Sequence, residues 1–330
     1  MIGLAFDFEV LKMISVIMPA FNSEKYILSS INSVLKYPYN DIELIVVDDF
    51  STDSTKNIVK SFSDKRVRYS LNKFSKGPNG CIETALSISK GNIITFLDSD
   101  DLIDWNVFYI YKKSFSNQMI DLVCVNFSFF YKNCVVKNKE RLSEGIYSQE
   151  TIFGKVLPIN DYPSIDPCRW AKAFRKEKLL NAFKMVDDTL IIGDDQSLLF
   201  NYLPLCQNVK IINKSFILYR QRATSIMHNT SIVFMADYDK MIDSLNYLDI
   251  EKENLRWYYF MVTIRRIKES KESVDAKRKE LSALRKYFKK RPILFFPNTK
   301  SKILYFILKF KFYFVILRFG KKPKKQTLFP

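Results

Sequence analysis

Short apolar runs rich in β-branched residues alternate with helical patterns over the first hundred residues. The runs ISVIMPAF (14–21), IELIVVDD (42–49) and NIITFLDSDD (92–101) end in polar or turn-forming residues and predict buried strands. Helical spacing occupies the segments between them, in SEKYILSSINSVLKY with Ser23 as the expected N-cap, and in STDSTKNIVKSF. This alternation predicts an α/β fold with a mostly parallel central sheet flanked by helices.

Polar and acidic residues follow the predicted strands. Parallel α/β sheets bind ligands beyond the carboxyl ends of their strands, so we expect Phe21 and Asn22, Asp48 and Asp49, and residues 98–101 to converge. Carboxylates crowded as in FLDSDD repel each other unless a cation lies among them. Mn²⁺ or Mg²⁺ prefers oxygen ligands and bridges carboxylates to a diphosphate. The pattern therefore predicts a metal-dependent site for a diphosphate ligand.

Several other chemistries lack their motifs. No G-x-G-x-x-G follows the first predicted strand, and the sequence holds no Walker loop, which disfavours dinucleotide oxidoreductases and P-loop nucleotidases. His228 is the sole histidine, which disfavours a Ser-His-Asp mechanism or a multi-histidine metal site.

The positive charge is concentrated at one end of the chain. The net charge is +17, but residues 281–330 hold fourteen Lys and Arg and no Asp or Glu. The preceding residues carry 38 basic and 35 acidic side chains and are nearly neutral. This distribution disfavours a nucleic-acid binder.

The basic tail, residues 291–330, is also rich in aromatic and aliphatic side chains. We expect it to associate with an anionic membrane surface. Its apolar runs are interrupted by Lys309 and Lys311 and are too short to span a bilayer. On a helix these two lysines project to opposite sides, so the pattern is not cleanly two-faced. The alternative is a tail that docks on the rest of the protein.

The five cysteines form no C-x-x-C pair and no dense framework, which is typical of reduced thiols. The first ten residues contain two acids and lack the basic n-region of a signal peptide. We therefore expect a cytoplasmic protein, peripheral on the inner face of the plasma membrane.

Two segments carry a resemblance to a known family. The opening ISVIMPAFNSEKYILSSINSVLKYPYNDIELIVVDDFSTDSTKNIV resembles that of the family 2 glycosyltransferases, and SKGNIITFLDSDDLID resembles their D-x-D strand. The resemblance covers about residues 13–228 and implies a GT-A type fold and inversion by direct displacement. It implies that the backbone near Pro19 and Ala20, together with Asp49, holds the nucleobase, commonly uracil, and that Phe21 belongs to the same donor nucleotide site.

The same resemblance implies roles for two carboxylates of the D-x-D strand. Asp98 is expected beside the ribose, and Asp100 is expected to coordinate Mn²⁺ or Mg²⁺ on the diphosphate.

Direct displacement needs a base that takes the proton of the acceptor hydroxyl. The segment MVDDTLIIGDDQSLLFNYL resembles the acidic pair of the family, so we expect Asp195 to be the base and Asp194 to orient the acceptor. The alternative is that one of them caps the helix that begins near Gln196.

Other candidates flank this pair. In DPCRWAKAFRKEKLL, Trp170 is expected to stack on an acceptor sugar, with core packing as the alternative. In ILYRQRATSIMHNTS, Arg220 and Arg222 resemble a loop that closes over the diphosphate, with solvated surface charge as the alternative.

The sequence departs from the family pattern at two sites. Phe50 replaces a small residue, and Ile82 and Glu83 stand where Arg and Asn are common. These departures leave a catalytically inactive nucleotide-sugar-binding module as the alternative function. A nucleotidyltransferase is disfavoured, because PAFNSEKY offers no glycine- and Arg/Lys-rich phosphate loop.

We expect four segments: an N-terminal extension (1–12), a GT-A domain (13–230), a helical extension (231–290) and the membrane-associating tail (291–330). The donor half of the domain is expected at about 13–105 and the acceptor half at about 106–230. The predicted function is transfer of a hexosyl or N-acetylhexosaminyl group. The donor is expected to be a nucleotide-sugar, with UDP as the expected nucleotide, and the acceptor a hydroxyl of a lipid-linked, lipopolysaccharide or capsule precursor.

Overall fold

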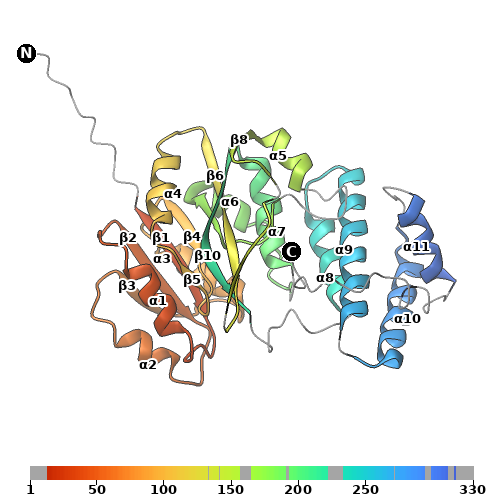
Figure 1. Ribbon diagram of the computed structural model, residues 1–330, viewed down its shortest axis with the longest axis horizontal. Coiled ribbons are helices and arrows are strands. Elements are labelled where there is room, and N and C mark those ends of the chain that lie inside the picture. The colour runs from red at the N-terminus through yellow and green to blue at the C-terminus, as the bar shows by residue number, and fades with distance from the viewer. Residues whose placement is uncertain are drawn as a thin grey trace, which may run out of the picture. The chain divides into compact units, whose positions relative to one another are not determined.

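A computed structural model describes residues 13–132, 134–140, 142–156, 165–190, 193–221, 233–270, 272–293, 299–310 and 316. The chain divides into two compact units (Figure 1). Unit 1 comprises the described residues up to Gln149, together with Cys168–Lys184 and Tyr202–Gln221. Unit 2 comprises the described residues of Glu150–Pro167, Met185–Asn201 and 222–330.

Within the described residues, the strands of unit 1 form one ten-stranded mixed sheet in the order β3-β2-β1-β4-β9-β6-β10-β5, with β7 beside β6 and β8 beside β10. The strands β1 to β4 pair in parallel, as do β6 and β10, whereas β5, β7, β8 and β9 pair antiparallel with their neighbours. The strands are β1 (Ile14–Ala20), β2 (Ile42–Asp48), β3 (Val67–Leu71), β4 (Ile93–Phe96), β5 (Leu102–Ile103), β6 (Ile120–Phe130), β7 (Val135–Lys137), β8 (Gly145–Ser148), β9 (Lys172–Arg175) and β10 (Asn208–Arg220). The helices of unit 1 are α1 (Ile27–Leu35), α2 (Thr55–Lys60), α3 (Pro78–Ile88), α4 (Val107–Phe115) and α6 (Lys176–Phe183).

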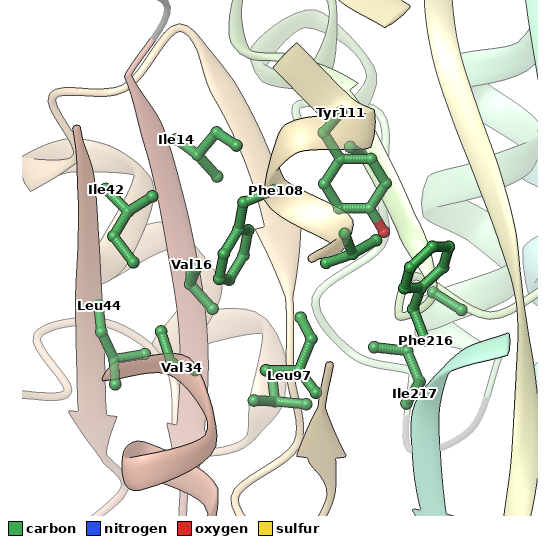
Figure 2. Packing of buried hydrophobic residues seen from close by; sticks show 14 of the residues in the cluster. Ile14, Val16, Val34, Ile42, Leu44, Leu97, Phe108, Tyr111, Phe216 and Ile217 are labelled. Atoms are coloured by element: carbon green, nitrogen blue, oxygen red, sulfur yellow. The ribbon is translucent and has the colours of Figure 1, made fainter. Parts of the chain in front are cut away.

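A hydrophobic core covers one face of this sheet. Alternate residues of β1, such as Val16, face the apolar sides of α1 and α4, from which Val34 and Phe108 project into the same cluster (Figure 2). The period of two along a strand and of 3.6 along a helix produces this meeting of apolar side chains. The core holds the sheet rigid and positions the loops at the carboxyl ends of its strands.

A buried carboxylate joins the opposite, amino ends of the strands. Glu43 at the start of β2 accepts hydrogen bonds from the hydroxyl of Ser15 (2.7 Å) and the backbone N–H of Lys90 (2.5 Å), and it pairs with Arg68 of β3. Burial raises the pKa of Glu43, but these hydrogen bonds and the Arg68 charge lower it below its ordinary value. Glu43 therefore ties β1, β2, β3 and the turn before β4 together as an ionised group.

Unit 2 contains the helices of the C-terminal part. They are α8 (Val233–Ser244), α9 (Asp249–Glu269), α10 (Val274–Lys290) and α11 (Thr299–Lys309). Two further helices, α5 (Gln149–Val156) and α7 (Asp194–Tyr202), include residues of both units. Among the described residues, no helix is both long enough and apolar enough to cross a membrane.

The three predicted strands and the α/β fold with a central sheet flanked by helices are confirmed, and the predicted parallel pairing is found among β1 to β4 and between β6 and β10. The Ser23 prediction is wrong: α1 begins at Ile27 with Tyr26 at the N-cap, because the Ser23 hydroxyl instead hydrogen-bonds that of Ser99 (2.7 Å). The pattern of β3 was too short and too polar to be predicted as a strand. The segment boundaries remain predictions, and residues 1–12 lie outside the described part of the chain.

Candidate functional site

The loops after β1, β2 and β4 meet at the carboxyl edge of the sheet. The Asn22 side chain accepts a hydrogen bond from the backbone N–H of Thr52 (2.8 Å) and thereby joins the first two loops. The hydroxyls of Ser23 and Ser99 (2.7 Å) join the first loop to the acidic one. The predicted convergence of the three strand ends is therefore present in the structure.

Asp49 holds a fourth loop against this edge. Its carboxylate accepts hydrogen bonds from the Asn72 side chain (2.7 Å) and the backbone N–H of Gly77 (2.9 Å). This loop lies between β3 and α3, and it folds back on the first turn of α3. A Cβ on Gly80 of that turn would lie 1.8 Å from the backbone oxygen of Ser75 in the loop. Only glycine fits at position 80, and this close approach brings the loop within reach of Asp49.

Its neighbour Asp48 has a structural role. The buried Asp48 carboxylate accepts hydrogen bonds from the backbone N–H of Ser51 (2.9 Å) and the Tyr69 hydroxyl (2.9 Å). Phe50, which stands between Asp49 and Ser51 in the sequence, is exposed and has a backbone φ of 62°, which is strained for a bulky side chain. The residue that departs from the family pattern thus lies at a strained turn beside Asp49.

The expected nucleobase residues lie on the same edge. Pro19 is half-buried and Ala20 is buried, and the Ala20 carbonyl accepts a hydrogen bond from the Asp49 N–H (2.8 Å). The Phe21 ring is exposed, with the Lys76 ammonium 5.7 Å from its centroid. An exposed aromatic face next to an anchored carboxylate is a suitable platform for a heterocyclic base.

The three aspartates after β4 are close enough to interact. Asp98 and Asp100 are half-buried, whereas Asp101 is fully buried and accepts a hydrogen bond from the backbone N–H of Arg220 (2.7 Å). Burial and the carboxylates of Asp98 and Asp100 raise the pKa of Asp101 well above its ordinary value. No described group donates to the second oxygen of Asp101.

This donor set suits a hard divalent cation, because concentrated carboxylate charge is stabilised by such an ion. Within the described residues, no group of three or more His, Cys, Asp or Glu side chains is arranged to hold a metal by itself. A metal here therefore needs further oxygen ligands from a substrate or from water.

Arg220, the last residue of β10, is built into the acidic loop. Its Nε donates a hydrogen bond to the backbone oxygen of Asp100 (2.6 Å). Its guanidinium lies over two rings, 4.9 Å from the centroid of Tyr26 and 4.8 Å from that of Phe130. Arg220 thus anchors the loop that carries the aspartates, while Arg222 lies outside the described residues.

An aromatic cluster adjoins the acidic loop in unit 1. Trp170 stacks on Tyr219 with ring centroids 5.0 Å apart and meets Phe127 edge-on at 4.7 Å. Burial and the nearby carboxylates of the acidic loop, Asp101 foremost, raise the pKa of Tyr219 above its ordinary value. Trp170 is half-buried, so it both packs on the core and keeps part of its surface accessible.

Asp194 and Asp195 belong to unit 2, where α7 begins at Asp194. The helix starts two residues before the expected Gln196, so both half-buried carboxylates lie in its first turn. The partial positive charge of a helix N-terminus stabilises anions at this position. Gly193, which precedes them, has a φ of 95° and lies against Tyr238.

The residues that support the site rather than line it are not evident from the sequence. Asn72 follows the unpredicted strand β3, and Tyr26 directly precedes α1. Phe130 and Tyr219 belong to β6 and β10, whose pairing is not visible in the local sequence. Ile82 is fully buried in α3, so this departure from the family pattern contributes packing where a cation is common.

The chain is similar to proteins of established family. The family model described as Glycosyl transferase family 2 matches residues 15–182. The UDP-Glc:alpha-D-GlcNAc-diphosphoundecaprenol beta-1,3-glucosyltransferase WfgD of Escherichia coli is 37% identical over 146 residues, which cover 44% of this chain and 55% of that protein. The chain therefore spans about half the length of this curated relative.

Two solved structures share the fold. The crystal structure of Staphylococcus aureus TarS 1-349 in complex with UDP-GlcNAc has a TM-score of 0.65 at 19% identity and covers 92% of this chain and 88% of TarS 1-349. Glucosyl-3-phosphoglycerate synthase from Mycobacterium tuberculosis in complex with Mn²⁺, UDP and phosphoglyceric acid has a TM-score of 0.50 at 20% identity and covers 72% and 80%. With the matched family model and the site at the carboxyl edge of the sheet, these similarities show that the chain belongs to glycosyl transferase family 2 and has the GT-A fold.

Proposed function

We propose that the protein transfers a hexosyl or N-acetylhexosaminyl group from a UDP-sugar to a hydroxyl of a lipid-linked or polysaccharide precursor, with inversion at the anomeric carbon. The observation that carries this proposal is the meeting of the three strand ends in one acidic site. The names of the relatives support it, because WfgD is described as using UDP-Glc and a diphosphoundecaprenol acceptor, and TarS binds UDP-GlcNAc.

The nucleotide is proposed to bind along the carboxyl edge of β1 and β2. The base would lie against the backbone of Pro19 to Phe21 and the carboxylate of Asp49, which is held in place by Asn72. Asp98 would contact the ribose. A preorganised carboxylate can accept hydrogen bonds from the base without first paying the entropy of ordering a loop.

Mn²⁺ or Mg²⁺ would be held by Asp100, with the diphosphate supplying further oxygens. Bound there, the ion would neutralise the charge that develops on the leaving nucleoside diphosphate. The protein positions this carboxylate through Arg220, which donates to the Asp100 backbone oxygen. Arg222 is proposed to contact the diphosphate.

On the acceptor side, Asp195 is proposed to take the proton of the attacking hydroxyl, and Asp194 to orient the acceptor. The hydroxyl oxygen would form the new bond to the anomeric carbon as the bond to the diphosphate oxygen breaks. Trp170 is proposed to stack on an acceptor sugar with the part of its surface that Tyr219 leaves accessible. The basic segment 291–330 is proposed to hold the protein at an anionic membrane surface, where a lipid-linked acceptor resides.

Calorimetric titration of UDP, with GDP and CDP as controls, tests the donor site. The titrations are made with and without Mn²⁺ on the wild type, on Asp100→Ala and on the matched control Asp104→Ala. Asp104 lies four residues further along, where its carboxylate accepts a hydrogen bond from the backbone N–H of Asn106 (3.0 Å). We expect Mn²⁺-dependent UDP binding that Asp100→Ala abolishes and Asp104→Ala preserves.

Absence of nucleotide binding to the folded wild type would refute the donor site. The buried Ile82 and the strained Phe50 favour one alternative, an inactive nucleotide-sugar-binding module. Metal-dependent UDP binding without turnover of any UDP-sugar, measured as UDP release with and without glycan acceptors, would support that module.

A further inference from the structure

Helix α11 has one face turned into unit 2. The Tyr305 ring lies 6.1 Å from that of Phe260 on α9 and 6.2 Å from that of Phe288 on α10, and Leu308 is buried beside it. The helix follows α10 along the blue end of the chain in Figure 1. At its C-terminal end, Arg285 of α10 donates a hydrogen bond to the backbone oxygen of Lys309 (2.8 Å). These contacts fix the rotation of α11 about its axis.

The other face of the helix exposes large apolar side chains. Ile303, Phe306 and Phe310 are 54%, 40% and 60% exposed. At about 100° per residue they fall within an arc of about 60°. The backbone N–H of Phe310 donates to the Phe306 oxygen (2.9 Å), and the two rings stack with centroids 6.1 Å apart. These three side chains, called here the outer face, form a continuous apolar strip.

Positive charge borders the outer face. Lys302 and Lys309 are exposed and seven residues apart, so they lie on the same flank of the helix. The Lys309 ammonium is 5.8 Å from the centroid of Phe306. Residues 299–310 contain no acidic side chain to balance these lysines. An apolar strip with an unopposed cationic edge complements a lipid surface that has anionic headgroups above acyl chains.

We propose that the outer face of α11 docks on an anionic membrane, with Ile303, Phe306 and Phe310 inserted at headgroup depth and the two lysines against lipid phosphates. A free phosphate ion would have no contact to make with the apolar strip, and an apolar protein partner would leave the two lysines without a counter-charge. This surface rests on the membrane association proposed for residues 291–330 and assigns it to one face of α11. It does not involve the nucleotide site, so vesicle binding and UDP binding are tested by separate experiments.

Co-sedimentation of the full chain with vesicles tests the proposal in the absence of nucleotide. Vesicles of phosphatidylcholine with phosphatidylglycerol are compared with vesicles of phosphatidylcholine alone. We expect the wild type to bind the anionic vesicles, and Phe306→Ser/Phe310→Ser to weaken binding at least about tenfold. The matched control, Ile250→Ser/Val274→Ser, removes two apolar side chains of unit 2 that are 47% and 58% exposed and should bind like the wild type.

A second variant, Lys302→Glu/Lys309→Glu, keeps the apolar strip and covers the case in which the serine variant does not fold. We expect it to lose binding to anionic vesicles and to keep the thermal unfolding midpoint of the wild type, because both lysines are exposed. Failure of the wild type to bind anionic vesicles, or unchanged binding by either folded variant, would overturn the proposal. A wild-type dimer that Phe306→Ser/Phe310→Ser converts to monomers, with vesicle binding unaffected, would assign the outer face to self-association instead.

Discussion

Replacing Arg220 by methionine tests how the acidic loop is held. The substitution removes the Nε donor to the Asp100 backbone oxygen and the cation between the rings of Tyr26 and Phe130. The backbone N–H of residue 220 still reaches Asp101, so the strand pairing of β10 is retained. The methionine side chain keeps much of the apolar contact with the two rings.

The contacts set the size of the effect. A hydrogen bond from a charged donor contributes about 1.5–3 kcal/mol. Each cation–π contact at a half-exposed site adds about 0.5–1 kcal/mol. Because these terms are not fully additive, we take about 2–3 kcal/mol for the anchoring of the loop. If UDP binding to the variant must supply the free energy that orders the acidic loop, the affinity for UDP falls by about 30-fold to 150-fold.

Titration of UDP in the presence of Mn²⁺ measures this loss for Arg220→Met. We expect the Kd to rise by that factor, with a smaller change when the metal is omitted. Tyr26→Leu and Phe130→Leu remove one ring each and keep the cation, so each should raise the Kd by about twofold to fivefold. Arg220→Lys should recover only part of the affinity, because lysine cannot reproduce the planar Nε donor.

The opposite pattern would refute the reasoning. If Tyr26→Leu and Phe130→Leu bind like the wild type and Arg220→Lys restores full affinity, the residue acts through its charge alone. Arg220 would then contact the diphosphate directly, the role implied by its resemblance to the family loop.

Three further outcomes are expected. Glu43→Gln should lower the free energy of unfolding by about 2–3 kcal/mol at neutral pH, because Arg68 loses its buried carboxylate. The folded pKa of Glu43 is lowered, so its contribution is present above the unfolded pKa and lost as the pH falls through the folded pKa. The difference in the free energy of unfolding between the wild type and Glu43→Gln, measured by urea unfolding, should therefore be smaller at about pH 3 than at about pH 7. Gly80→Ala should destabilise the fold by about 1–3 kcal/mol and weaken UDP binding, since its Cβ displaces the Ser75 loop held by Asp49; a melting curve and UDP titration like those of the wild type would contradict this. Asp195→Asn should reduce sugar transfer by about 10²–10⁴ with the Kd of UDP unchanged, and full activity in a transfer assay would exclude it as the base.

Local patterns were sufficient to predict the framework of the donor side. The runs at 14–21, 42–49 and 92–101 are apolar enough to be buried and end in residues that cannot continue a buried strand. Parallel strands joined by helices place such ends at one edge, so the convergence of the loops after β1, β2 and β4 followed from periodicity and connection rules. Helices α8, α9 and α10 lie within the helical extension expected at 231–290.

Only the tertiary packing decided which aspartate after β4 is buried and which face of α11 is exposed. The sequence does not distinguish the buried Asp101 from the half-buried Asp98 and Asp100, because only the pairing of β10 with its neighbours brings the Arg220 amide to one of them. It also leaves the outer face of α11 ambiguous, since apolar residues occur on more than one side of the helix. Packing of Tyr305 against α9 and α10 selects the face that stays exposed. The periodicity of burial is a local property of the chain, whereas the partner of the Asp101 carboxylate, Arg220, lies more than a hundred residues further along the chain and reaches it only through the tertiary fold.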